Sequence, residues 1–214
     1  MNRKNILLIG RGFLGEYIVQ KSKDLEYEIT STNFSKNNNK HSKTLDITKI
    51  DQLENLIKRV NPDYLINCAA RGDIDFLEQH PDLANKINCE GAANVAKISE
   101  ENKIRLIHIS TDSVFDGKKG QYSENDKPNP LNVYAKSKYA GELKIEKNSK
   151  DYVIIRTNFY GLNERKKYFF NWILKNLKSQ NKIIGFTDVI FSPLDVISLS
   201  KMILELLTLD FRGI

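Results

Sequence analysis

Short runs of apolar residues alternate along the chain with longer segments in which apolar residues recur every three or four positions. The runs predict strands at Asn5–Ile9, Tyr27–Asn33, Tyr64–Asn67, Ile104–Ser110 and Tyr152–Arg156. The periodic segments predict helices at Phe13–Ser22, Ile50–Val60, Leu83–Glu101, Val133–Asn148 and Lys166–Ser179, with a last one near Leu194–Leu207. Strands that alternate with such helices form βαβ units with right-handed crossovers. We therefore expect an α/β fold with a doubly wound parallel sheet.

The regular alternation weakens after about Thr157. We expect residues 1–156 to form one domain built on the sheet, and residues 157–214 to form a small, apparently shortened lobe over its edge. The stretch Ser35–Lys43 has low sequence complexity and is expected to be an exposed loop.

Composition narrows the class of protein. The chain has 214 residues, of which 40% are hydrophobic, and no apolar run reaches the roughly 18 residues of a membrane span. The net charge of +6 is spread over the chain without a basic stripe, which argues against a nucleic-acid partner. Two cysteines, Cys68 and Cys89, make no disulfide framework, and no signal peptide precedes the first strand, so we expect a cytoplasmic protein. The three histidines lack metal-ligand spacing, and no metal site is expected.

A glycine-rich turn follows the first predicted strand and opens the first predicted helix. Gly10-Arg11-Gly12-Phe13-Leu14-Gly15 has the form G-x-G-x-x-G. Glycines permit a tight turn and a close approach of pyrophosphate to the backbone, and the helix N-terminus supplies N–H groups and a positive dipole end. The turn predicts a dinucleotide site; the alternative is a glycine turn without a ligand.

The end of the second strand indicates which dinucleotide. An acid there would bond the ribose 2′-hydroxyl and repel a 2′-phosphate, but Asn33-Phe34-Ser35-Lys36 contains none. Arg11 and Lys36 are both placed to reach a 2′-phosphate, so NADPH is favoured, with NADH possible. Asp46, which precedes Ile47, either bonds the adenine amine or begins the following helix.

Tyr134 and Lys138 are four residues apart, which places both side chains on one helix face. A phenol, with an ordinary pKa near 10, transfers protons poorly at neutral pH unless a cation lowers that pKa. Lys138 is expected to do so and to hold a cofactor ribose. Tyr17 and Lys21 form a second such pair on the first helix, interpreted as surface residues. Thr111 ends a strand, and with Tyr134 and Lys138 it forms a set suited to a carbonyl that receives hydride.

Further segments complete a family pattern. They are Asn67-Cys68-Ala69-Ala70, Asn88, the block His108–Gly117, Tyr122-Ser123-Glu124, Pro130–Glu142 and Arg156–Gly161. In these segments, which span about residues 4 to 209, the chain resembles the extended short-chain dehydrogenases/reductases, and most closely the dTDP-4-dehydrorhamnose reductase family. The resemblance implies a Rossmann fold, a nucleotide-sugar substrate, and hydride transfer from a nicotinamide to the 4-keto group of a 6-deoxy sugar. It also implies a possible homodimer.

The motifs and the resemblance together assign the site residues. The expected catalytic residues are Thr111, Tyr134 and Lys138. The expected cofactor-binding residues are Gly10, Arg11, Gly12, Phe13, Leu14, Gly15, Asn33, Lys36, Asp46, Ile47, Cys68, Ala69, Ala70, Arg71, Asn88, Ser110, Tyr134 and Lys138. The expected substrate-binding residues are Thr111, Asp112, Ser113, Asn158 and Phe159.

The chain also departs from the family pattern. Its glycine loop is one residue shorter than the usual G-x-x-G-x-x-G, and Asn158 stands where an aromatic residue is often found. Phe211–Ile214 resembles the start of a further strand. Two alternatives remain open: a sugar-nucleotide epimerase or dehydratase of the same fold, for which Asp112 is a candidate acid, and a non-catalytic NADP-binding regulatory or partner subunit.

Overall fold

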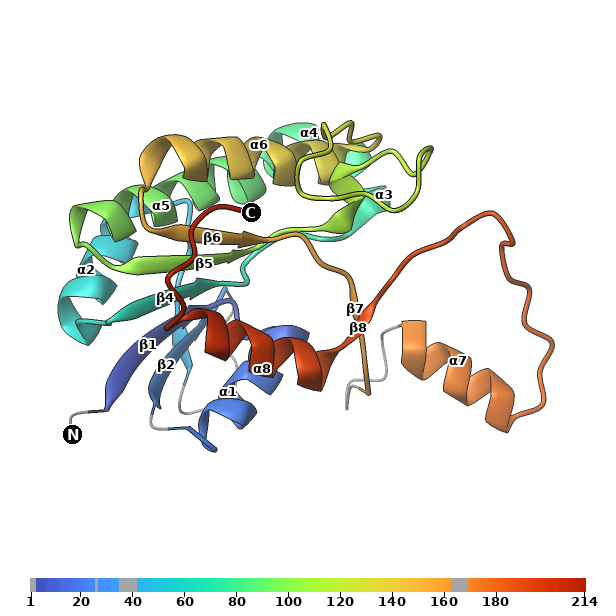
Figure 1. The fold of residues 1–214 in the computed structure, drawn as a ribbon, viewed down its shortest axis with the longest axis horizontal. Helices are drawn as coiled ribbons and strands as arrows, with labels where there is room; N and C mark the ends of the chain where they lie inside the picture. Colours follow the sequence, from blue (N-terminus) through green and yellow to red (C-terminus); the bar gives the residue numbers. More distant parts are fainter. Residues whose placement is uncertain (1–2, 26, 35–41, 163–168) are drawn as a thin grey trace.

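The computed structural model describes residues 3–25, 27–34, 42–162 and 169–214. Its main sheet is parallel, with the strand order β3-β2-β1-β4-β5-β6 (Figure 1). These strands are β1 (Lys4–Ile9), β2 (Tyr27–Asn33), β3 (Ser42–Thr44), β4 (Tyr64–Asn67), β5 (Arg105–Ile109) and β6 (Tyr152–Ile155). The order reverses between β1 and β4, and such a switch point creates a crevice at the strands' carboxyl ends. The expected doubly wound sheet is confirmed.

Helices cover both faces of this sheet (Figure 1). One face carries α2 (Ile50–Val60), α5 (Gly91–Glu101) and α6 (Val133–Asn148); the other carries α1 (Phe13–Ser22) and α8 (Val196–Leu206). Each face buries its own apolar cluster, with Leu7 and Leu106 in the first and Leu8 and Ile107 in the second. Adjacent strand residues thus point to opposite sides, and both sides are apolar, which explains the uninterrupted hydrophobic runs. Within the described ranges, no helix has both the length and the apolar character needed to cross a membrane.

The predicted helix Leu83–Glu101 is not uniform. The structure has α4 (Pro81–Ala84), a π-helical segment η1 (Asn85–Glu90) and then α5. This region packs closely on α6, because a Cβ added at Gly141 would lie 2.4 Å from the carbonyl oxygen of Asn88. Because only six residues adopt the π-helical pitch, the spacing of apolar residues is almost the same as in a continuous α-helix. The sequence pattern therefore does not reveal the π-helical segment. The short elements α3 (Ile74–Glu78), η2 (Asp112–Val114) and β3 were not predicted either.

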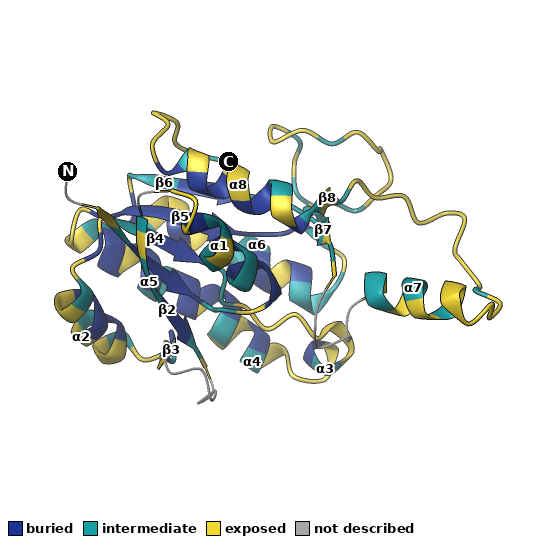
Figure 2. Cartoon of the chain, turned by 90° about the horizontal axis from the view of Figure 1, so that it is seen from below, coloured by how far each residue is buried: buried dark blue, intermediate teal, exposed yellow. Residues whose placement is uncertain are grey.

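The residues after 157 pack in two different ways. Strands β7 (Phe159–Tyr160) and β8 (Leu194–Asp195) pair in parallel, and α8 follows β8 at once and buries Leu199 and Ile203 in the core. In contrast, α7 (Phe169–Lys178) and the segment after it project from the sheet and are largely exposed (Figures 1 and 2). The first three residues of the predicted helix Lys166–Ser179 lie outside the described residues, as does most of Ser35–Lys43.

The C-terminal residues return to the sheet. Gly213 forms an isolated parallel bridge with Val153 of β6, which agrees with the expected start of a strand. The buried Arg105 guanidinium donates to the carbonyl oxygens of Leu206, Leu209 and Phe211 at 3.3, 2.7 and 2.6 Å. A buried cation with these acceptors fastens the end of the chain to β5.

Candidate active site

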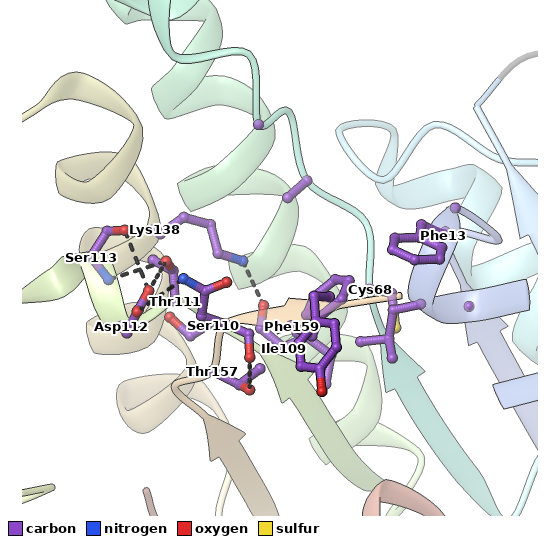
Figure 3. A pocket seen from close by; sticks show the side chains of 18 of the residues that line it. Phe13, Cys68, Ile109, Ser110, Thr111, Asp112, Ser113, Lys138, Thr157 and Phe159 are labelled. Atoms are coloured by element: carbon purple, nitrogen blue, oxygen red, sulfur yellow. Dashed lines mark hydrogen bonds between the residues drawn. The ribbon is translucent and has the colours of Figure 1, made fainter. Parts of the chain in front are cut away.

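A cleft of about 610 Å³ opens at the carboxyl ends of the central strands (Figure 3), a size typical of small-molecule sites. The glycine loop and Phe13 lie at one end, Ser113 lies at the other, and Cys68 and Phe159 lie between them. Its lining includes fifteen of the expected residues: Gly10, Gly12, Phe13, Leu14, Gly15, Cys68, Ala70, Ser110, Thr111, Asp112, Ser113, Tyr134, Lys138, Asn158 and Phe159. Residues far apart in sequence therefore meet at the predicted edge of the sheet.

The three glycines of the loop have different structural roles. Gly10 has φ +89°, and a Cβ there would lie 2.7 Å from the backbone nitrogen of Ala69. A Cβ on Gly15 would lie 2.6 Å from the carbonyl oxygen of Gly10, so this glycine lets α1 approach the turn. Gly12 precedes α1, and a Cβ there would meet nothing within 4 Å. The open space at Gly12 and the adjacent helix N-terminus suit an anionic group.

Arg11 lies across the start of α1, beside β2. Its guanidinium donates to both carboxylate oxygens of Glu16, at 2.8 and 3.0 Å, and to the Ser31 hydroxyl at 3.3 Å. The guanidinium holds the pKa of Glu16 below its ordinary value. A cation is thus fixed near the end of β2, where a dinucleotide-binding fold places the adenosine ribose. Lys36, the second expected cation, lies outside the described residues.

The loop after β5 contributes a group of polar side chains. The Thr111 hydroxyl accepts from the backbone N–H of Ser113 at 3.2 Å and thereby caps η2. The Asp112 carboxylate accepts from the Thr111 hydroxyl at 3.3 Å and from the Asn158 amide at 3.3 Å. Asn158 follows β6, so this contact joins the two sides of the cleft.

Tyr134 lies in the first turn of α6. Asn132 caps the helix, because its side chain accepts from the Ala135 N–H at 2.7 Å, and this cap fixes the first turn in which Tyr134 lies. Burial raises the pKa of the Tyr134 phenol, a hydrogen bond with Thr111 lowers it, and the Asp112 carboxylate raises it further. The net direction is upward, so the expected lowering of this pKa by Lys138 is not what the structure shows.

Lys138 is buried one turn further along α6. Its Nζ atom donates to the carbonyl oxygen of Ile109 at 2.7 Å (Figure 3). The same atom lies 3.2 Å from Nε2 of His108. Burial lowers the pKa of Lys138 to about 8, while Glu142 and Cys68 act in the opposite direction. A lysine with such a pKa exchanges its proton near neutral pH, as groups at functional sites often do.

A buried ion pair holds the ends of β5 and β6 against α6. Arg156 and Glu142 approach to 2.7 Å, and the Glu142 carboxylate also accepts from the hydroxyl of Ser110. The Arg156 guanidinium lies 5.3 Å from the centre of the Phe115 ring. The pair is desolvated, so removing one partner would leave an uncompensated buried charge. Its place beside Lys138 and the cleft supports the geometry of the site.

Comparison with known proteins identifies the family. The sequence model described as the RmlD substrate binding domain matches residues 4–212. The chain belongs to this family. The RmlD-family chain is similar in structure to the dTDP-4-dehydrorhamnose reductase of Bacillus anthracis in complex with NADP, with 33% identity and a TM-score of 0.87 over 99% of this chain and 73% of the other.

Two curated relatives of this RmlD-family chain differ in their stated roles. The probable low-salt glycan biosynthesis reductase Agl14 of Haloferax volcanii is 32% identical over 79% of this chain and 58% of its own length. Methionine adenosyltransferase 2 subunit beta of Bos taurus is 30% identical over 77% of this chain and 49% of its own length. The chain thus spans about half the length of these relatives.

Several expected residues of the RmlD-family chain lie outside the cleft lining: Arg11, Asn33, Asp46, Ile47, Ala69, Arg71 and Asn88. Ile47 is buried in the apolar cluster, and the Asp46 carboxylate accepts from the backbone and hydroxyl of Thr48 at 3.0 and 2.8 Å within a local turn. Asn88 accepts from the Arg71 N–H at 2.9 Å and donates to the Ser137 hydroxyl at 3.0 Å. These side chains form the framework behind the lining, and their contact with a cofactor stays a prediction.

The structure also adds lining residues that the motifs and the resemblance did not assign to the site. The lining includes Gly72, Ile109, Thr157, Tyr160, Gly161, Phe169, Phe170 and Phe191. A Cβ on Gly161 would lie 2.6 Å from the Val196 side chain, so this glycine allows β7 to approach α8. The aromatic residues come from β7, the start of α7 and the segment after α7, where the alternation of strands and helices weakens. Among the described residues, no three His, Cys, Asp or Glu side chains gather as metal ligands would.

Proposed function

We propose that this chain is an NADPH-dependent reductase of the 4-keto group of a nucleotide-linked 6-deoxy sugar. The observation that carries the proposal is the convergence of Thr111, Tyr134 and Lys138 on the cleft that also contains the glycine loop. The relatives support it, since a similar structure is a dTDP-4-dehydrorhamnose reductase in complex with NADP.

The residues of the glycine loop fit a dinucleotide. The open space beside Gly12 suits a pyrophosphate that even a methyl group would obstruct, and the N-terminus of α1, which Gly12 precedes, offers N–H groups to an anion. Arg11, held by Glu16 beside β2, would contact a 2′-phosphate. Cys68 and Ala70 would flank the cofactor along the middle of the cleft.

When bound, the nicotinamide supplies the hydride that is transferred to the carbonyl carbon of the substrate. Thr111 would donate a hydrogen bond to the carbonyl oxygen, and Tyr134 would deliver the proton to that oxygen. Because the pKa of Tyr134 is raised, the phenol is protonated at neutral pH, which is the form that reduction requires. Asp112, Ser113, Asn158 and Phe159 lie beside these groups, where the sugar would bind.

A second candidate is a cofactor-binding partner subunit without turnover. The similarity to methionine adenosyltransferase 2 subunit beta favours this candidate. The two functions are separated by offering the purified protein NADPH and dTDP-4-keto-6-deoxy sugars prepared in situ. Consumption of NADPH establishes the reductase, whereas binding of NADPH without consumption favours the partner subunit.

We also propose that two copies of this chain pair through α5 and α6. The expected cytoplasmic location stays a prediction. Sedimentation at micromolar concentration is expected to show a dimer. A single species of 24.6 kDa would contradict the pairing.

Two glycine substitutions are expected to separate cofactor binding from folding. Gly12→Ala should change the free energy of unfolding by less than about 1 kcal/mol, because its methyl group meets no protein atom, yet weaken NADPH binding by more than about tenfold. Gly10→Ala should instead destabilise the fold by about 2 kcal/mol or more, because of its positive φ and its clash with Ala69. Denaturant titration and fluorescence titration with NADPH measure the two effects. Unchanged affinity in Gly12→Ala would place the pyrophosphate elsewhere.

Arg11→Ala is expected to weaken NADPH binding by about tenfold and NADH binding very little, because the lost charge-assisted bond involves the 2′-phosphate alone. Lys21→Ala provides the matched control, since it removes one cation from the helix that follows the glycine loop, at a site where the lysine pairs with Asp24 at 3.7 Å. Equal losses for both cofactors in Arg11→Ala would assign the guanidinium to the loop's structure and not to cofactor choice.

A further inference from the structure

A buried carboxylate, that of Glu142, lies one helical turn beyond Lys138 on α6. Glu142 is 1% exposed and lies outside the lining of the cleft. Residues four apart on a helix share a face, so its side chain lies on the same side of α6 as that of Lys138. Buried charges need partners, and the partners of Glu142 connect it to both sides of the lysine.

Arg156, which follows β6, holds the Glu142 carboxylate from one side. Its Nη2 and Nε atoms donate to Oε2 at 2.7 and 3.1 Å, and Nε also donates to Oε1 at 3.3 Å. The hydroxyl of Ser110, which follows β5, donates to Oε1 as well. Charge-assisted bonds of this number fix both the position and the orientation of the carboxylate.

Ser110 also links this carboxylate to the lysine through the backbone. Its N–H donates to the carbonyl oxygen of Ile155 at 2.8 Å, which continues the pairing of β5 and β6 past the end of β5. The carbonyl oxygen of the preceding residue, Ile109, accepts from Nζ of Lys138 at 2.7 Å (Figure 3). The backbone that carries the Ser110 hydroxyl to Glu142 therefore also fixes the acceptor of the lysine.

The carboxylate acts on two cations, on Arg156 by direct contact and on Lys138 through space. Burial lowers the pKa of Lys138 to about 8, and the charge of Glu142 acts against this lowering. Such an attraction is strong where water is excluded. We propose that Glu142, held in place by Arg156 and Ser110, is a positioning residue that keeps Lys138 a charged ammonium in the cleft at neutral pH.

The other titratable groups beside Lys138 are neutral at this pH. Burial lowers the pKa of His108, a residue of β5 whose Nε2 lies 3.2 Å from Nζ, well below its ordinary value. Burial raises the pKa of the Cys68 thiol, which follows β4, to about 12. It also raises the pKa of the Tyr134 phenol on α6. These three groups therefore do not supply the negative charge that an ammonium needs.

The loop after β5 provides a second carboxylate, that of Asp112. Its oxygen atoms accept from the hydroxyl of Thr111 and from the amide of Asn158, each at 3.3 Å, on the side of the cleft proposed for the sugar. Glu142 instead lies on the face of α6 that carries Lys138. We therefore assign the stabilisation of the ammonium to Glu142.

The consequence for the reaction rests on the proposed function. Among the described residues, Nζ of Lys138 has two polar contacts, with Ile109 and His108, whereas an ammonium has three N–H donors. The remaining donor is available to the cofactor ribose that Lys138 is expected to hold. The charge of Lys138 thus strengthens the binding of NADPH, and Glu142 sets the pH above which that charge is lost.

The first test measures the ionisation of Lys138 by ¹³C NMR of full-length protein labelled at the Cε atoms of lysine. The signal that is lost in Lys138→Met identifies the residue. We expect this signal to titrate at about pH 8 in the wild type, so that most of Lys138 is charged at neutral pH. A wild-type midpoint below about pH 7 would overturn the proposal, because the lysine would then be mostly uncharged.

Glu142→Gln should lower the midpoint of Lys138 by at least about one pH unit, because the carboxylate is lost and the Arg156 cation stays. This variant leaves a buried cation without its partner, which threatens the fold. The double variant Glu142→Gln/Arg156→Met removes both charges and is expected to fold, since apolar residues often replace a buried ion pair without loss of stability. Its midpoint should also fall, but by less, because a neighbouring cation is lost as well.

Glu146→Gln is the matched control, because it makes the same substitution one turn further along α6 at an exposed position. It should leave the midpoint of Lys138 unchanged. An unchanged midpoint in the double variant, with folding verified by circular dichroism, would overturn the proposal, since an ion pair that only supports the fold would not affect this titration.

The dissociation constant of NADPH, measured by fluorescence titration as a function of pH, provides a second readout. In the wild type it should rise by about tenfold or more as Lys138 loses its proton. In the double variant this rise should begin at a lower pH, displaced by as much as the NMR midpoint. An equal loss of affinity at every pH would contradict the role of the ammonium in binding. A displaced NMR midpoint in a protein that does not bind NADPH would contradict the proposed function alone.

Discussion

Tyr134→Phe is expected to reduce NADPH consumption with a 4-keto sugar nucleotide by about 10²–10⁴-fold, the usual contribution of a positioned acid. The variant keeps the ring and loses only the hydroxyl, which interacts with Thr111 in the cleft lining. Steady-state rates give the loss, and fluorescence titration with NADPH should show nearly unchanged binding. The loss should therefore appear in kcat.

Tyr139→Phe is the matched control, because it removes a hydroxyl from the same helix at a position outside the cleft lining. Its rate should stay within about twofold of the wild type, since substitutions away from special features have small effects. A Tyr134→Phe variant with the wild-type rate would remove Tyr134 from the proton transfer and leave Thr111 or Asp112 as the candidate acid. Loss of NADPH binding together with the rate would instead assign the hydroxyl to the cofactor.

The sheet could be predicted from the sequence because its strands are buried on both faces. Such strands appear as uninterrupted apolar runs. The G-x-G-x-x-G turn after the first run indicates that a ligand would bind at the carboxyl end of that strand. The π-helical segment Asn85–Glu90 could not be predicted, because six residues are too few for their apolar pattern to distinguish one helical pitch from another. The close packing of Gly141 on Asn88 is visible only when α6 is in place.

The candidate site was predictable where one local motif carries the chemistry. Gly12, Thr111 and Tyr134 belong to such motifs, and the parallel topology brings them to one edge of the sheet. The surroundings of Lys138 were not predictable, because His108 reaches it from a strand 30 positions earlier. Sequence spacing suggested a cation that lowers the pKa of Tyr134, but burial raises that pKa and lowers the pKa of Lys138.

Lys138→Met is expected to stabilise the folded protein while it removes activity. Burial lowers the pKa of Lys138 from 10.5 to about 8, which corresponds to about 3 kcal/mol of unfavourable free energy at neutral pH, at about 1.36 kcal/mol per pH unit. Methionine fills a similar volume without a charge, and the lost bond to Ile109 offsets about 1 kcal/mol. The free energy of unfolding at pH 7, measured by denaturant titration, should therefore rise by about 2 kcal/mol.

The free energy of unfolding of the wild type and of Lys138→Met, measured as a function of pH, tests this prediction most directly. Below pH 8 the lysine is protonated in both the folded and the unfolded state, so the free-energy penalty of burying its charge does not change with pH. Between about pH 8 and 10.5 only the unfolded state binds this proton, and the free energy of unfolding of the wild type therefore rises with pH. Lys138→Met should lack this rise, so the advantage of the variant should shrink as the pH increases through that range. Parallel stability curves for the two proteins would show that Lys138 is not desolvated in solution. A gain in stability together with lost turnover would show that the fold retains a costly buried lysine for its chemistry.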